Sequence, residues 1–270
     1  MPKNQNKPYR FISQNKYFDL DSPNNPFSSE KQLSIIIPTY NEAENIKEIV
    51  SKVKDVIGET EFKNSYEIII VDDNSKDNTY ELLLSLSKTE KNFIGINRLK
   101  RGIASAVLDG INAANGSIVL TLDADLSHPP EKIPELLSYI KDYDIVIGSR
   151  YTKGGKMDAS FARKWGGFFL NRMCSFIIGT SVRDLGGNFR LFRKDSFKKI
   201  KFRYPCTFAE FGHEIFYRAE KEGLKIKEVP FVYYNRKKGK SKMGELPVKQ
   251  AIHYIKRAFQ LRFEPFLKYN

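Results

Sequence analysis

The stretch "SIVLTLDADLSHPPEKIPEL", residues 117–136, decides the fold, because an apolar run, a pair of acids and a helical pattern follow one another in it. Residues 117–122 are apolar and rich in β-branched side chains, which predicts a buried strand. Residues 130–140 repeat apolar side chains at helical spacing, which predicts a helix soon after the strand. The stretch therefore predicts a strand and a helix with two acids, Asp123 and Asp125, where the strand ends.

Asp123 and Asp125 predict a metal site. Side chains at positions i and i+2 of an extended chain share a face, so the two carboxylates repel each other unless a cation lies between them. Mg²⁺ or Mn²⁺ accepts such hard oxygen ligands, and Mg²⁺ often completes its coordination with water and substrate phosphate oxygens. We therefore expect a divalent cation here beside a diphosphate, and we expect His128 to support the site or to pack rather than to bind the metal.

The alternation of apolar runs and helical patterns continues on both sides of this stretch. Its other members are apolar runs at residues 33–38, 68–71 and 145–148 and helical patterns at residues 41–57 and 76–87. Apolar strands separated by helices are typical of an α/β fold with a mostly parallel sheet and helices on both faces. In such sheets ligands bind beyond the carboxyl ends of the strands, which is where the polar residues of this sequence fall.

The two ends of the chain differ from its centre. Residues 1–30 are rich in Asn, Lys, Ser and Pro without a period, so we expect a flexible arm or a strap over the surface. Residues 236–270 begin with the basic segment "RKKGKSKMG" and continue with apolar residues at helical spacing. We expect three parts: the arm, a domain at residues 31–235, and a basic loop with an amphipathic C-terminal helix at residues 236–270.

The composition is that of a globular protein with a strong positive charge, with 41% hydrophobic residues and a formal net charge of +13. Such an excess of Lys and Arg favours anionic partners, for example phosphate-bearing substrates or an anionic membrane surface. We do not expect nucleic acid as a partner, because no helix-turn-helix, zinc or RNA-recognition signature is present. A dinucleotide oxidoreductase is disfavoured as well, because no G-x-G-x-x-G follows a predicted strand.

Targeting signals are also absent from the sequence. We find no signal peptide and no apolar run of about 20 residues, the length that a membrane span needs. Cys174 and Cys206 have no metal-ligand spacing, and we expect reduced, buried thiols of a cytosolic protein.

Polar side chains follow the other predicted strands at the point where each strand ends. Tyr40 and Glu42 follow the first strand, where Asn41 is a candidate helix cap. Asp73 ends the second strand, where a carboxylate can accept hydrogen bonds from a ribose or a base. Arg150 ends the fourth strand and is a fixed cation suited to an anion. Helix capping alone explains so many acids poorly, so we predict one polar site at this edge of the sheet.

Six segments resemble, in the same order, those of the dolichol-phosphate mannose synthases, which are family 2 glycosyltransferases of GT-A fold. The segments are "IIIPTYNEAENI", "VDDNSKDNT", "LDADLSHPPEKIPEL", "IGSRYTKGG", "RDLGGNFRLFRK" and "GKSKMG". The resemblance covers roughly residues 33–245 and implies inverting transfer of a sugar from a nucleoside diphosphate sugar to a polyprenyl phosphate. It implies GDP-mannose and dolichyl phosphate as the substrate pair, with UDP-glucose or a UDP-N-acetylhexosamine as alternative donors.

Carried over residue by residue, the resemblance assigns three groups of positions. The nucleotide sugar is assigned to Pro38, Tyr40, Glu42, Val71, Asp73, Asp123, Ala124, Asp125 and Arg150. The acceptor phosphate is assigned to Arg150, Arg163, Arg236 and Lys242. The metal, Mg²⁺ or Mn²⁺, is assigned to Asp123, Asp125 and, by position, Ser127, where some relatives have a glutamine ligand. Asp125 and Arg150 are the two residues assigned to catalysis, and Gly167 stands where some members have a serine beside the acceptor phosphate.

The identity of the acceptor decides whether the reaction needs a base. A phosphate monoester with a second pKa near 6 is already anionic at pH 7, so it can attack the sugar without losing a proton. The enzyme then has to bring two anions together, which Arg and Lys side chains can do. A hydroxyl acceptor, as in glycan or polysaccharide extension, needs a general base, for which Asp184 is the only well-placed candidate. The sequence leaves both acceptors open.

A polyprenyl phosphate stays in a bilayer, so the resemblance implies a peripheral enzyme on the cytoplasmic face of a membrane, that of the endoplasmic reticulum in a eukaryote. Residues 161–179 combine aromatic side chains such as Trp165 with basic ones such as Arg163, and the tail pairs an apolar stripe with basic residues. These combinations are typical of interfacial helices. Two alternatives stay open: the stripes pack on the sheet, or the tail binds a membrane-anchoring partner subunit.

Overall fold

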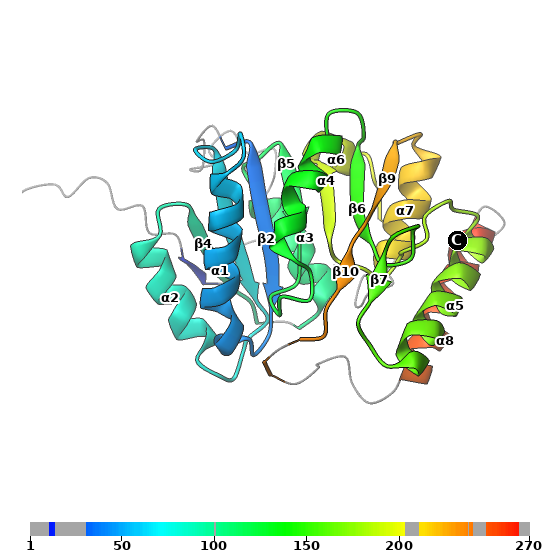
Figure 1. Ribbon diagram of the computed structural model, residues 1–270, viewed down its shortest axis with the longest axis horizontal. Helices are drawn as coiled ribbons and strands as arrows, with labels where there is room; N and C mark the ends of the chain where they lie inside the picture. The colour runs from blue at the N-terminus through cyan, green and yellow to red at the C-terminus, as the bar shows by residue number, and fades with distance from the viewer. Residues whose placement is uncertain are drawn as a thin grey trace, which may run out of the picture.

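The computed structural model describes residues 11–13, 31–99, 101–202, 211–236, 238–239 and 247–264. Its centre is an eight-stranded sheet with the order β1-β4-β3-β2-β5-β8-β6-β9 (Figure 1). Within this sheet β8 runs antiparallel to both of its neighbours, β5 and β6, and the other pairs are parallel. The predicted α/β fold with a mostly parallel sheet is therefore confirmed.

The elements alternate along the chain as expected. The strands of the large sheet are β1 (Phe11–Ser13), β2 (Leu33–Thr39), β3 (Tyr66–Asp72), β4 (Phe93–Asn97), β5 (Ile118–Thr121), β6 (Ile145–Ser149), β8 (Arg190–Arg193) and β9 (Ile226–Pro230), and the short pair is β7 (Lys156–Met157) with β10 (Val232–Tyr233). The helices are α1 (Ala43–Gly58), α2 (Thr79–Thr89), α3 (Ile103–Ala113), η1 (Pro130–Lys132), α4 (Ile133–Tyr139), α5 (Phe161–Ile178), α6 (Lys194–Lys198), α7 (Phe211–Lys221) and α8 (Pro247–Phe263).

Helices cover both faces of the sheet because successive side chains of the buried strands point to opposite sides. In β2, Ile35 and Ile37 pack in one apolar core with Ile49 of α1 and Leu136 of α4. Ile36 points the other way, into a second core that includes residues of α3, α5, α7 and α8. Helices α5 and α8 lie against each other at one end of the molecule (Figure 1). The sheet is thus buried on both faces and leaves its strand ends for chemistry.

The termini of two predicted helices differ from the sequence-based expectation. The predicted cap Asn41 is wrong, since α1 begins at Ala43 and Asn41 has a φ of 50°. The Asn41 side-chain oxygen accepts a hydrogen bond from the Lys76 N–H (2.7 Å) and so ties two strand-end loops together. The helical pattern at residues 76–87 predicts an earlier start than is observed, since α2 begins at Thr79, where Asp77 accepts the Thr79 N–H (3.1 Å).

Three further elements add to the sequence-based prediction. Residues 11–13, within the expected arm, form β1 and pair with β4 at one edge of the sheet. Neither β4 nor α3 was predicted, and both contribute a loop to the site described below. Pro230, which has no N–H to donate, closes β9 at the other edge of the sheet. No helix in the described ranges reaches the length and apolar content of a bilayer span.

A buried histidine makes the stability of the fold depend on pH. His213 of α7 is 2% exposed, and neither ring nitrogen has a hydrogen-bond partner among the residues that the structure describes. Burial, with the nearby charges of Arg190 and Arg257, lowers the pKa of His213 to about 3. The unfolded chain, with a histidine pKa near 6.5, therefore binds a proton that the folded chain does not bind. The stability contributed by the neutral His213 is complete above pH 6.5 and is lost as the pH falls below that value.

We expect His213→Phe to weaken this pH dependence. Lowering the pH from 7 to 5 costs about 2 kcal/mol of unfolding free energy for one histidine with such a depressed pKa. Urea unfolding at pH 7 and pH 5 measures the cost, and His213→Phe should lose less stability than the parent over this interval. His253→Gln, a substitution at an exposed position of α8, is the control and should behave like the parent. Equal losses in the parent and in His213→Phe would contradict the assignment.

Candidate active site

Side chains from four strand ends meet at one edge of the sheet. The parallel register places Thr39 of β2 beside Asp72 of β3, and the Asp73 N–H donates to the Thr39 carbonyl (2.9 Å). The chain after β5 is held in the same way, since the Leu122 N–H donates to the Ile36 carbonyl (3.2 Å). The predicted polar residues therefore lie on neighbouring strand ends, as the rule for parallel sheets requires.

The two acids after β5 are fixed by the turn that they open. Asp125 is buried, and its Oδ1 accepts the Ser127 N–H (3.1 Å), while Leu126 has a φ of 62°. Asp123 is more open, with 31% of its side chain exposed. Its Oδ1 accepts a hydrogen bond from Nδ2 of Asn188 (3.0 Å), in the loop before β8. Asp125 is therefore buried and hydrogen-bonded within the turn, while the side chain of Asp123 is partly exposed.

His128 supports this turn, in agreement with the sequence-based expectation. Its Nδ1 accepts the Asp123 N–H (3.1 Å), and its ring stacks on Phe189 with the ring centroids 5.3 Å apart. Burial lowers the pKa of His128, so the imidazole is neutral with its proton on Nε2. Because Nδ1 is used within the turn, His128 acts as a packed support for Asp123.

The pair Asp123 and Asp125 fits a divalent cation that shares substrate oxygens. Among the residues that the structure describes, no three His, Cys, Asp or Glu side chains gather as a complete metal site. Two carboxylates leave coordination positions for a diphosphate and water, which is how Mg²⁺ is commonly held. When bound there, the cation would neutralise the charge of a leaving diphosphate. The assignment of Ser127 stays a prediction; its side chain is fully buried under the turn.

Arg236 joins the acids of two strand ends. Its Nη2 donates to Oε1 of Glu42 (3.0 Å) and to Oδ2 of Asp125 (2.8 Å). Burial alone would raise the pKa of Asp125, but hydrogen bonds from Ser127 and the charge of Arg236 hold that pKa below its ordinary value. Glu42 also accepts a hydrogen bond from Nδ2 of Asn45 (2.6 Å). Arg236, which the resemblance assigned to the acceptor phosphate, thus lies beside the acids assigned to the donor.

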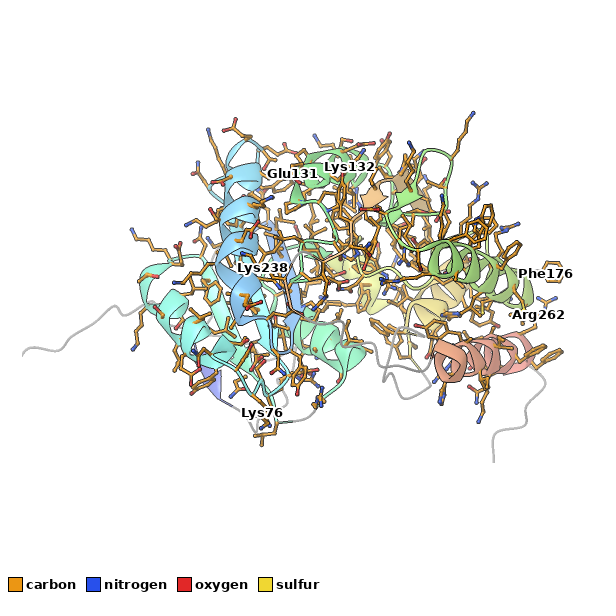
Figure 2. The ribbon with its side chains drawn as sticks, turned by 60° about the horizontal axis from the view of Figure 1, so that its bottom comes forward. Lys76, Glu131, Lys132, Phe176, Lys238 and Arg262 are labelled. Carbon is orange, nitrogen blue, oxygen red and sulfur yellow. The ribbon has the colours of Figure 1, made fainter. Side chains whose placement is uncertain are left out.

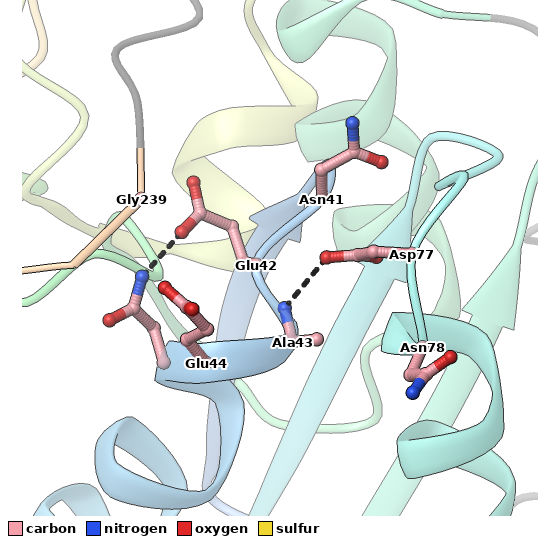
Figure 3. A pocket seen from close by; sticks show the side chains of 8 residues that line it. Asn41, Glu42, Ala43, Glu44, Asp77, Asn78 and Gly239 are labelled. Carbon is pink, nitrogen blue, oxygen red and sulfur yellow. Dashed lines mark hydrogen bonds between the residues drawn. The ribbon is translucent and has the colours of Figure 1, made fainter.

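A polar hollow of about 300 Å³ adjoins Glu42 at the start of α1 (Figure 3). It is lined by Asn41, Glu42, Ala43, Glu44, Asn45, Asp77, Asn78 and Gly239. In Figure 3 the Ala43 N–H points to Asp77 and closes one wall of the hollow (3.2 Å). The lining offers hydrogen-bonding groups of the kind that sugar or ribose hydroxyls require.

The loop from β4 to α3 covers the ends of β2 and β3. Both oxygens of Asp73 are engaged by it, Oδ1 by Nη1 of Arg98 (2.5 Å) and Oδ2 by the Gly102 N–H (2.8 Å). Burial raises the pKa of Asp73, although these two contacts oppose the shift. The Arg101 guanidinium lies 3.7 Å from the centroid of the Tyr40 ring. The residues assigned to the nucleoside are therefore organised by a loop that the sequence analysis did not identify.

A second cluster of charge lies at the end of β6. Nε and Nη2 of Arg150 donate to the two carboxylate oxygens of Asp184, at 2.8 and 2.7 Å. Burial alone would raise the pKa of Asp184, but the Arg150 guanidinium holds that pKa below its ordinary value. A carboxylate with a lowered pKa and both oxygens occupied is a poor proton acceptor. Asp184, the acid that the sequence analysis offered as a base for a hydroxyl acceptor, is thus committed to an ion pair.

Tyr233 of β10 connects the two halves of the site. The guanidinium groups of Arg150 and Arg163 lie 5.5 and 5.8 Å from the centroid of its ring. The ring of His128 also packs against Tyr233, in a T-shaped arrangement with the centroids 6.0 Å apart. Tyr233 therefore contacts both Arg150 and Arg163 and the turn that carries Asp123 and Asp125.

The glycine at position 167 has a structural explanation. A Cβ at Gly167 would lie 2.6 Å from the Tyr151 hydroxyl oxygen, so that hydroxyl fills the space beside this turn of α5. Tyr151 in turn lies under Arg150, with the guanidinium 5.2 Å from its ring centroid. The Tyr151 hydroxyl therefore lies beside Gly167, and the Tyr151 ring lies near the Arg150 guanidinium.

The remaining assigned residues contribute in other ways or lie elsewhere. Val71 and Ala124 are buried, and Pro38 is half-buried in β2. Lys242 lies outside the described residues, so its assignment stays a prediction. The contacts above join Glu42 and Asp125 through Arg236, hold Asp73 and Tyr40 against the loop from β4 to α3, and pair Arg150 with Asp184.

Comparison with known proteins identifies the family of this chain. Residues 34–201 match the family described as Glycosyl transferase family 2. Dolichol-phosphate mannosyltransferase from Pyrococcus furiosus is 35% identical over 231 residues, which are 84% of this chain and 63% of the relative. Undecaprenyl-phosphate 4-deoxy-4-formamido-L-arabinose transferase from Proteus mirabilis is 34% identical over 62% of this chain and 51% of its own length. The chain thus spans between half and two thirds of the length of these relatives.

Solved structures show the same fold at low sequence identity. A mannosyltransferase from Pyrobaculum calidifontis in complex with GDP-Man and Mn²⁺ superposes with a TM-score of 0.59 at 18% identity, over 88% of this chain and 65% of that chain. Mannosyl-3-phosphoglycerate synthase from Rubrobacter xylanophilus gives a TM-score of 0.64 at 16% identity, over 89% of this chain and 77% of that chain. The sequence match and the shared fold agree, and the chain belongs to glycosyl transferase family 2.

Proposed function

We propose that the protein is an inverting, metal-dependent glycosyltransferase that moves mannose from GDP-mannose to a polyprenyl phosphate such as dolichyl phosphate. The observation that carries this proposal is the ion pair between Arg150 and Asp184. The pair occupies Asp184, the candidate base, and the acceptor would bind beside Arg150 and Arg163. The relatives named for dolichol phosphate and undecaprenyl phosphate support a polyprenyl phosphate as the acceptor class.

The proposed reaction requires no proton transfer. A phosphate oxygen of the acceptor forms a bond to the anomeric carbon from the face opposite the leaving group, which inverts that carbon. The bond from this carbon to the diphosphate oxygen breaks, and its electron pair leaves with the nucleoside diphosphate. Arg150 and Arg163 would hold the acceptor phosphate against the repulsion of the donor phosphates. Tyr40, Glu42 and Asp73 would position the nucleoside end of the donor.

Transfer to a hydroxyl is the alternative, and the geometry disfavours it. A hydroxyl acceptor must lose its proton to a base in the transition state. Asp184 is fully buried, and its oxygens accept hydrogen bonds from Nε and Nη2 of Arg150. Taking up a proton would break this pair and leave a buried guanidinium without its counter-charge, which is costly. A phosphate acceptor avoids this cost.

The donor is tested by thermal unfolding of the purified protein with GDP, UDP and their mannose and glucose conjugates, each with and without Mn²⁺. A ligand that binds the folded state at 100 times its Kd adds about 2.7 kcal/mol to the free energy of unfolding. We expect GDP and GDP-mannose with Mn²⁺ to raise the melting temperature most. A larger rise with UDP and UDP-glucose would overturn the proposed donor, and no rise with any nucleotide would overturn the proposed function.

We also propose that α5 and α8 dock on the membrane that holds the acceptor. Helix α5 exposes Phe161, Trp165, Phe169 and Phe176, and Phe176 is 87% exposed. Figure 2 shows Phe176 projecting from α5 next to Arg262 of α8. Exposed aromatic side chains beside Lys and Arg are characteristic of helices that lie in the lipid interface. Arg163 of α5 also lies over Tyr233, so this surface is continuous with the basic cluster.

We expect Phe169→Asp with Phe176→Asp to release the protein from vesicles. Replacing these two exposed aromatic side chains with acids removes apolar contact with the lipid and adds repulsion from anionic headgroups, whereas each basic group near such a surface contributes about 1 kcal/mol of attraction. Co-sedimentation with phosphatidylserine-containing vesicles measures the effect. The control, Asn64→Asp with Ser85→Asp, adds the same charge at exposed positions away from α5 and should bind like the parent. Equal recovery of the parent in the supernatant with and without vesicles would contradict docking and point to an anchoring partner subunit.

A further inference from the structure

Asp184 is held rigidly against Arg150. Asp184 Oδ2 accepts the backbone N–H of Arg150 (2.9 Å) and its Nε (2.8 Å), and Oδ1 accepts Nη2 (2.7 Å). A guanidinium is a planar fork, so two hydrogen bonds along one edge fix the direction of the whole group. Asp184 leaves Nη1 of Arg150 without a hydrogen-bond acceptor among the described residues. The pairing therefore determines where the remaining donor edge points.

The loop that carries Asp184 is itself fastened to the edge strand of the sheet. Glu228 of β9 accepts the Arg183 N–H with Oε2 and the Asp184 N–H with Oε1, both at 3.1 Å. The Gly187 N–H closes the turn onto Oδ1 of Asp184 (3.1 Å). Strand β9 pairs with β6, the strand that ends at Arg150, so both partners of the ion pair are tied to one ladder.

We propose that Asp184 is a positioning residue that aims Arg150 at the acceptor phosphate, with Glu228 holding Asp184 in place. The inference rests on the proposed function, since it takes the acceptor to be a phosphate. Asp184 compensates the charge of Arg150, so the contribution of Arg150 is direction. Arg163, which also lies near the Tyr233 ring, has no acidic partner among the described residues and supplies net positive charge. Asp184 therefore acts through Arg150 and has no contact of its own with the reacting atoms.

A positioning role and a role as a base predict different effects of Asp184→Asn on KM, on kcat and on the pH profile. Asp184→Asn keeps the size of the side chain but has one acceptor oxygen, so it cannot hold both Nε and Nη2. We expect the KM for farnesyl phosphate to rise about 10-fold, as for loss of a charge-assisted contact. The KM for GDP-mannose should stay within about two-fold, and the pH profile of kcat should keep its shape. A base would instead lose kcat and change the pH profile.

A double-mutant cycle with Arg150→Ala tests the coupling directly. If Asp184 acts only through Arg150, Asp184→Asn should cost less than about three-fold in kcat/KM once Arg150 has been removed. The matched control is Asp144→Asn, at the opposite end of β6, where Asp144 accepts the Lys225 N–H and the Ser196 hydroxyl. This control should leave the KM for farnesyl phosphate unchanged. Glu228→Gln provides a second variant in which Asp184 keeps its charge, and we expect its KM for farnesyl phosphate to rise about three-fold.

The outcomes separate this inference from the proposed function. Transfer to farnesyl phosphate by the parent, together with a cycle in which the two effects multiply, would overturn the inference alone. An unchanged KM for farnesyl phosphate in both Asp184→Asn and Glu228→Gln would do the same. If Asp184→Asn fails to fold, the Glu228→Gln result decides in either direction. Transfer by the parent to farnesol but not to farnesyl phosphate would overturn both the proposed function and the inference.

Discussion

Asp123→Asn or Asp125→Asn is expected to reduce the rate of sugar transfer by about 1000-fold, because each substitution removes a charge that would hold the divalent cation at the leaving diphosphate. Both residues follow β5: Asp123 is partly exposed, and Asp125 accepts a hydrogen bond within the turn. The measurement is the initial rate with saturating Mn²⁺, together with Mn²⁺ binding followed by electron paramagnetic resonance in the presence of GDP. Both the rate and the metal affinity should fall.

The control for this prediction is Asp142→Asn, at an exposed position before β6, which should transfer sugar at the parent rate. The chelator EDTA provides an independent check, since the parent should become inactive in its presence and recover when Mn²⁺ or Mg²⁺ is added. Full activity of the parent in EDTA would show that no divalent cation is essential and would contradict the assignment of the two aspartates.

Arg150→Ala is expected to lower kcat/KM for the phosphate acceptor by between about 10-fold and 100-fold. A charge-assisted contact of this kind contributes about 1.5–3 kcal/mol. The same substitution leaves the buried Asp184 without its counter-charge, which costs about 3–5 kcal/mol of folding stability. Rates should therefore be compared well below the melting temperature of the variant, and Asp184→Asn combined with Arg150→Ala should melt at a higher temperature than Arg150→Ala.

The pH dependence of stability provides a further check on this ion pair. Because Arg150 lowers the pKa of Asp184 in the folded protein, the pair stabilises the fold above the pKa of an unfolded aspartate, near 3.9, and this contribution is lost as the pH falls further. In Arg150→Ala the contribution should be absent. An identical dependence of stability on acid pH in the parent and in Arg150→Ala would contradict the ion pair as the cause.

The architecture could be predicted where apolar runs are uninterrupted. The predicted strand at residues 33–38 ends one residue before the observed β2, which ends at Thr39. Pro38 lacks an N–H, but it still lies in register with Val71 of β3, so the strand continues past it. Strand β4 escaped prediction because Gly95 interrupts its apolar run in the middle, which weakens a strand signal. The apolar segment "FIGIN" at residues 93–97 was the signal that could have identified it.

The residue types of the site could be predicted from the sequence, but not which side chains form hydrogen bonds and ion pairs with one another. Strand-end acids and arginines are visible in the sequence because their position follows from the fold. Their pairing is not visible: Arg236 reaches Glu42 across 194 residues, and Arg98 reaches Asp73 across 25 residues through an unpredicted loop. Asp184 illustrates the consequence, since the sequence offered it as a base and the structure shows it in an ion pair with Arg150.

The central claim, that the acceptor is a phosphate and needs no base, is tested most directly by offering the enzyme two acceptors that differ only in that group. Farnesyl phosphate and farnesol are each incubated in detergent with radiolabelled GDP-mannose and Mn²⁺, and the mannosylated lipid is extracted and counted. We expect a mannosyl phosphate lipid from farnesyl phosphate and no product above background from farnesol. Transfer to farnesol at a rate equal to or above that to farnesyl phosphate would contradict the central claim.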